Sequence, residues 1–95
     1  MPRNATLEVS DRQARQLTAG PAERVFLFNH GPASITISGS TSDVEPVEMI
    51  GPSIPPGFAL PVSFPLIELF PGIAGVNRLW AIAGVGGANV FVSHA

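Results

Sequence analysis

The stretch RLWAIAGVGGANVFVSHA, residues 78–95, decides the fold class, because two strand-like runs flank a glycine-rich joint. The runs RLWAIA and ANVFVSH predict two strands that form a closing hairpin across GVGG. The second run continues almost to the last residue. An exposed apolar edge strand invites aggregation, so we expect this run to be central in a sheet or paired with another chain.

The glycine-rich joint, residues 84–87, also raises the question of a phosphate-binding loop. Such a loop needs a G-x-G-x-x-G pattern and a helix that follows it. Here the pattern is missing and a strand-like run follows. We therefore interpret the joint as a turn with residues at positive φ.

The middle of the chain repeats the strand–turn–strand pattern. ERVFLFN is apolar at both alternating positions, which predicts a central strand, and SITIS alternates cleanly. Gly31 and Pro32 mark the turn between them. Residues 24–38 are therefore predicted to form a hairpin.

The remaining segments add short strands. ATLEVS predicts a half-buried strand, and DRQARQL is either its continuation or a single helical turn. We expect a short edge strand at residues 47–50 and another strand after the turn in IPPGFALPV. Flanking prolines argue against a helix in PLIELFPG.

About six to eight short strands with regular turn signals predict an all-β fold, a single small antiparallel β-sandwich or barrel. The expected core includes Val25, Leu27, Ile35, Ile37, Leu60, Ile82, Val90 and Val92.

Composition limits the classes of function. The chain has 95 residues, enough for one domain, and only 13% are charged, against roughly 25% in an average soluble domain. A chain with so few charged residues has a surface that is either covered by a partner or made of polar, uncharged side chains. The net charge of −2 disfavours nucleic acid, and prolines at 61, 65 and 71 argue against a membrane-spanning helix. The N-terminus lacks the apolar run of a signal peptide, and there is no cysteine.

Four of the five basic residues lie within residues 1–24. We divide the single domain into residues 1–24, an N-terminal strand and candidate arm, and residues 25–95, the β-sandwich. As an arm, the segment would contact a partner's carboxylates through Arg3, Arg12 and Arg15. The alternative is an ordinary edge strand with solvated charges.

No pattern of reactive residues predicts catalysis. His30 and His94 are the only histidines, and their spacing matches no metal site. No nucleophile elbow is present. The prediction is a protein that is not an enzyme and has no cofactor or metal. Trp80 lies in an apolar run, which favours a core or interface position over a sugar-binding one.

Three blocks of the chain carry a family resemblance: PAERVFLFNHGPASITISGS, SIPPGFALPV and RLWAIAGVGGANVFVSH. Their order resembles the small β-structured virion proteins encoded in the structural gene clusters of tailed phages. Those proteins often show xxRxxLxIxNxGxxxVxIG, then an LxPG strand, then LYAIxxxGxxxVxV. The matching residues are Arg24, Phe26, Phe28, Asn29, Gly31, Ile35, Ile37, Gly39, Pro56, Gly57, Leu79, Trp80, Ala81, Ile82, Gly87, Val90 and Val92. The segment LPVSFPLIELFPGIAGVN departs from the pattern, being longer and more apolar.

The resemblance implies a head decoration, minor capsid or head-fibre protein on the capsid surface of a virion, with the major capsid protein as partner. No nucleic-acid or membrane partner is expected. The alternative is a fibre or adsorption module that binds a host glycan. Low charge, a single Trp and the absence of Tyr favour the decoration module.

Residues 58–77 hold more apolar side chains than one small core can bury. A contiguous apolar patch of this kind marks an interface. Closed symmetry is the usual way to cover it, so we expect a homotrimer, with a dimer next. The candidate interface residues are Phe58, Phe64, Leu66, Leu69, Phe70 and Ile73, together with Trp80.

Overall fold

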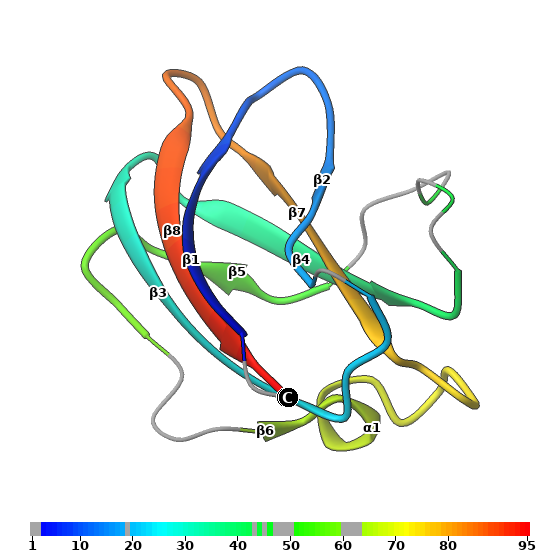
Figure 1. The fold of residues 1–95 in the computed structure, drawn as a ribbon. Coiled ribbons are helices and arrows are strands. Elements are labelled where there is room, and N and C mark those ends of the chain that lie inside the picture. The colour runs from blue at the N-terminus through cyan, green and yellow to red at the C-terminus, as the bar shows by residue number, and fades with distance from the viewer. Residues whose placement is uncertain (1–2, 19, 43, 45, 47–50, 60–63) are drawn as a thin grey trace.

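The computed structural model describes residues 3–18, 20–42, 44, 46, 51–59 and 64–95, with only the backbone of Arg3 and Phe64. Two antiparallel sheets pack face to face as a β-sandwich, which confirms the predicted all-β class (Figure 1). The elements are β1 (Arg3–Val9), β2 (Arg15–Gln16), β3 (Arg24–Pro32), β4 (Ile35–Ser40), β5 (Ser53–Ile54), β6 (Phe64–Pro65), α1 (Leu66–Leu69), β7 (Arg78–Ala83) and β8 (Ala88–His94).

Within the described residues, each sheet has four strands. Sheet A has the order β1-β8-β3-β6, and sheet B has the order β2-β7-β4-β5. Strand β8 therefore lies between β1 and β3, which confirms a central position for the run at residues 88–94. Strand β3 is also internal, as its apolar sequence predicted.

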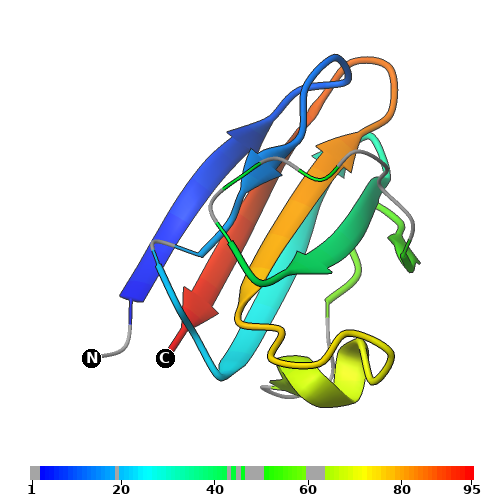
Figure 2. The same cartoon turned by 90° about the vertical axis from the view of Figure 1, so that its right-hand side faces the viewer.

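Both predicted hairpins are wrong. Strands β3 and β4 belong to different sheets, and so do β7 and β8, so each turn carries the chain across the sandwich (Figure 2). Apolar alternation identifies the buried face of a strand but not the strand that pairs with it. The two crossings are tied together, because the Gly84 N–H donates to the Ser34 carbonyl at 2.9 Å and the Ala33 N–H donates to the Gly87 carbonyl at 3.2 Å.

The core lies between the two sheets and matches most of the predicted set. Val25, Leu27, Ile35, Ile37, Val90 and Val92 are buried. Ile82 is only half-buried, since Leu79, Ala81 and Ala83 are the residues of β7 that join the core cluster. Leu60 lies outside the described residues, as does the predicted strand at 47–50.

The prolines around PLIELFPG do not prevent a helix. One helical turn, α1, forms at Leu66–Leu69 between Pro65 and Phe70. Proline fits before the first turn of a helix, because the first N–H groups have no partner within the helix. Leu66 is fully buried, so α1 closes one end of the sandwich (Figure 2).

Residues 3–18 belong to the body of the sandwich and do not extend from it as an arm. Strand β1 pairs with β8 along its whole length, and β2 pairs with β7. Val9 and Leu17 are buried in the core. Between the strands, the Ser10 hydroxyl oxygen accepts the N–H groups of Arg12 and Gln13, so a turn replaces the predicted continuation or helical turn.

Candidate interaction surfaces

Aromatic side chains gather on the outer face of sheet A. Inward and outward positions alternate along β3 and β8, and Phe26, Phe28 and Phe91 take half-buried outward positions. Phe28 faces Phe91 in the strand register. The rings of Phe26 and Phe91 meet edge to face at 6.3 Å. We call Phe26, Phe28 and Phe91 the aromatic face.

Phe58 lies next to β3, on the segment that precedes β6. The Asn29 N–H donates to the Phe58 carbonyl at 2.9 Å, and Ala59 forms a bridge with Phe28. The Phe58 side chain is 62% exposed. On the same outward side of β3, the His30 ring lies 4.7 Å from the Phe28 ring. Protein interfaces are enriched in aromatic residues at their centre and have polar residues at their rim, and this surface has the same composition.

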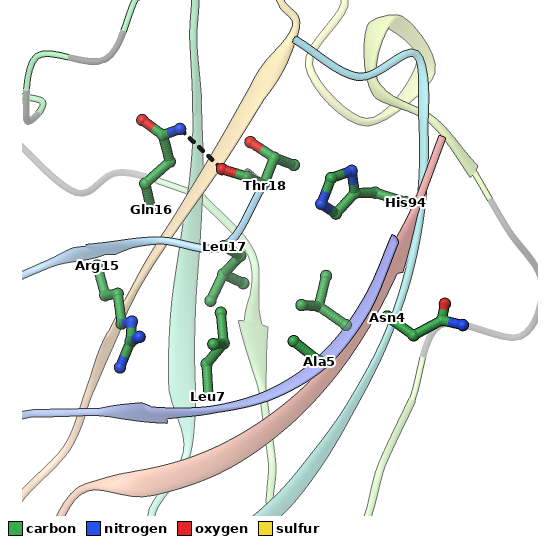
Figure 3. Close-up of a pocket in the computed structure, with 9 residues that line it drawn as sticks. Asn4, Ala5, Leu7, Arg15, Gln16, Leu17, Thr18 and His94 are labelled. Atoms are coloured by element: carbon green, nitrogen blue, oxygen red, sulfur yellow. Dashed lines mark hydrogen bonds between the residues drawn. The ribbon is translucent and has the colours of Figure 1, made fainter. Parts of the chain in front are cut away.

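A groove of about 360 Å³ opens between β1 and β2, at one lateral side of the sandwich. Leu7 and Leu17 point toward each other across it, and Asn4 points away (Figure 3). Arg15 reaches from β2 to donate to the Glu8 carbonyl at 3.0 Å. The groove is therefore apolar at its floor and has a cationic side chain at one end.

Trp80 is 7% exposed. It is not a member of the hydrophobic core cluster that fills the space between the two sheets. Its indole N–H donates to the Ser40 hydroxyl oxygen at 3.0 Å. The buried ring offers no face on which a sugar can stack in this fold.

The predicted interface residues do not form one patch. Leu66 and Phe70 are buried, and Leu69 and Ile73 are half-buried against the core. Phe58 is exposed, whereas the side chains of Arg3 and Phe64 lie outside the described part. Arg12 and Arg15 are exposed on the turn and strand that follow β1.

The glycine joint forms the expected turn, with positive φ at Gly86 (100°) and Gly87 (72°). His30 is exposed and His94 is buried at the end of β8. Among the residues that the structure describes, no three His, Asp or Glu side chains gather as metal ligands. In the same described ranges, no helix is long and apolar enough to cross a membrane.

Comparison with family models, curated proteins and solved structures finds no match to this chain. The candidate surfaces therefore rest on the geometry alone. The aromatic face was missed at the sequence level, although FLF in β3 and VFV in β8 put apolar residues at both alternating positions. In the sequence analysis the pattern in β3 predicted only a central strand.

Proposed function

We propose that this protein is a structural module of a tailed-phage virion, a decoration protein that docks on the capsid surface and performs no catalytic step. The aromatic face is the observation that carries the proposal. Half-buried phenylalanines on the outside of a sheet are apolar surface that a partner can cover. The resemblance to small virion proteins supplies the kind of partner, the major capsid protein.

The role is mechanical, with many copies bridging neighbouring capsid subunits. Covering about 100 Å² of apolar ring surface contributes about 2.5 kcal/mol per copy. Repetition over a capsid lattice makes such modest contributions add up. The low charge of the chain, 13% of residues, also fits a surface that is covered in the assembly.

The test is co-sedimentation of the purified protein with emptied heads of the phage that encodes it. Phe28→Ser removes a ring of the aromatic face, and Phe58→Ser removes the exposed ring on the segment next to β3. We expect each change to weaken head binding about tenfold or more, the effect of losing an interface anchor.

The matched control is Val85→Ser, which removes an apolar side chain that is 92% exposed on the β7–β8 turn. This variant should bind heads as the unmodified protein does. Thermal melting establishes that each variant is folded. Folded Phe28→Ser and Phe58→Ser proteins that bind heads with unchanged affinity would contradict the docking role of the aromatic face.

A further inference from the structure

His30 adds a titratable group beside the aromatic face. It is exposed on the outward side of β3, and its ring lies 4.7 Å from the Phe28 ring. The register of β3 against β8 shifts between Asn29 and Gly31, so His30 is the extra residue of a β-bulge. Bulges re-aim side chains and are common beside functional sites. Because the two rings are in contact, a partner that covers Phe28 also covers part of the imidazole.

Few charges surround this imidazole among the described residues. The elements packed against β3 at this point are β8 and the segment 55–59, and neither residues 88–91 nor residues 55–59 include a charged side chain. The carboxylate of the same sheet face is that of Glu8 on β1, which pairs with Asn89 on the far side of β8. Two strand spacings amount to about 10 Å, a distance at which salt screens exposed charges. Glu8 therefore gives an imidazolium at residue 30 little compensation.

We propose that His30 makes docking on the capsid depend on pH, with tight docking when its imidazole is neutral and weak docking when it is protonated. This inference rests on the docking role of the aromatic face proposed above. Histidine side chains change their charge between about pH 5 and 8. In the free protein water hydrates the exposed imidazolium, whereas a partner over Phe28 removes part of that water. Removal of water from a charged group is costly when no opposite charge replaces it.

The direction of the effect follows from proton linkage. Docking disfavours the protonated imidazole, so the docked protein binds fewer protons than the free protein. Docking is then tightest above the range in which the imidazole titrates, and it weakens as the pH falls through that range. A permanent cation at residue 30 imitates the protonated state at every pH.

The test is co-sedimentation of the full chain with emptied heads at about pH 8 and at about pH 5.5, on the two sides of the histidine range. We expect the unmodified protein to bind about tenfold more weakly at the lower pH. His30→Gln is neutral at both values, so its affinity should change by less than about twofold. The heads and the buried His94 are the same in both experiments, so the difference between the two pH profiles belongs to His30.

His30→Arg supplies a second variant, which should bind heads about tenfold more weakly than the unmodified protein at the higher pH and should not recover at the lower one. The matched control, Thr41→Arg, adds the same charge at an exposed bend after β4. This control should bind as the unmodified protein does. Thermal melting at both pH values establishes that each variant is folded.

The outcomes separate this inference from the docking role itself. Equal pH dependence of the unmodified protein and His30→Gln would overturn the role of His30 and leave docking intact. The same holds if His30→Arg binds as tightly as Thr41→Arg. Absence of binding by the unmodified protein at the higher pH would instead contradict docking, and the pH dependence with it.

Discussion

At the scale of single residues, Asn29 holds one end of the sandwich together. Its side chain is fully buried, and its amide nitrogen donates to the carbonyls of Ala33 and Ile54, both at 2.9 Å. Its amide oxygen accepts the Gly31 N–H at 2.8 Å. One side chain therefore joins β3, the crossing to β4, and β5. Nothing in the sequence distinguishes this asparagine from an ordinary turn residue.

We predict that Asn29→Ala lowers the free energy of unfolding by about 3 kcal/mol, because it leaves buried backbone groups without a partner. Chemical denaturation measures the loss. The control is Asn89→Ala on the exposed side of β8, which should change stability by less than about 0.5 kcal/mol. If Asn29→Ala lowered the free energy of unfolding as little as Asn89→Ala does, the Asn29 contacts would contribute little to stability.

Gly39 is a second residue with a specific structural role, because the packing around it leaves no room for a side chain. A Cβ atom there would lie 2.7 Å from Val76 Cγ2 and 2.8 Å from Phe70 Cδ2. We expect Gly39→Ala to cost about 1–3 kcal/mol through overpacking. At Gly72 an added Cβ meets nothing within 4 Å, so Gly72→Ala is the matched control and should be nearly neutral. Thermal melting of both variants separates the two cases, and equal melting temperatures would refute the close packing at Gly39.

At the scale of elements, β1 and β2 are parts of the two sheets. We predict that deletion of residues 1–16 unfolds the protein, since it removes the strand that pairs with β8 and the buried side chains of Val9 and Ala14. Far-UV circular dichroism should lose the β spectrum. Thr6→Ser, at an exposed position of β1, should keep it. A truncated chain that still melts cooperatively with a β spectrum would restore the arm interpretation.

The sequence predicts elements better than their partners. The alternation in SITIS correctly predicted that Ile35 and Ile37 are buried, and the glycines correctly predicted the positions of turns. The pairing of β3 with β4 and of β7 with β8 was predicted wrongly. A turn between two strands has the same sequence pattern whether it closes a hairpin or connects two different sheets. The one-turn helix α1 was not predicted, because the flanking prolines were expected to prevent a helix. Pro65 instead lies just before the first turn of α1, where proline is tolerated.

At the scale of the whole molecule, some apolar side chains of the described residues remain outside the core, among them Phe58 and Ile67 from the segment 58–77 in which such an excess was predicted. Their position was not predictable. Leu66 and Phe70, expected at the surface, fill one end of the sandwich, while Phe26 and Phe28 remain half-buried on its outside. Burial depends on how the segment after β5 folds back onto the sheets, and no local pattern encodes that path.

The most direct test of the central claim, docking on a capsid, is a titration of emptied phage heads with the purified protein, followed by counting the bound copies. The proposed decoration role predicts saturable binding at a fixed ratio to the major capsid protein, because each copy occupies a repeated site on the lattice. Absence of binding, or uptake that rises with concentration and never saturates, would contradict it.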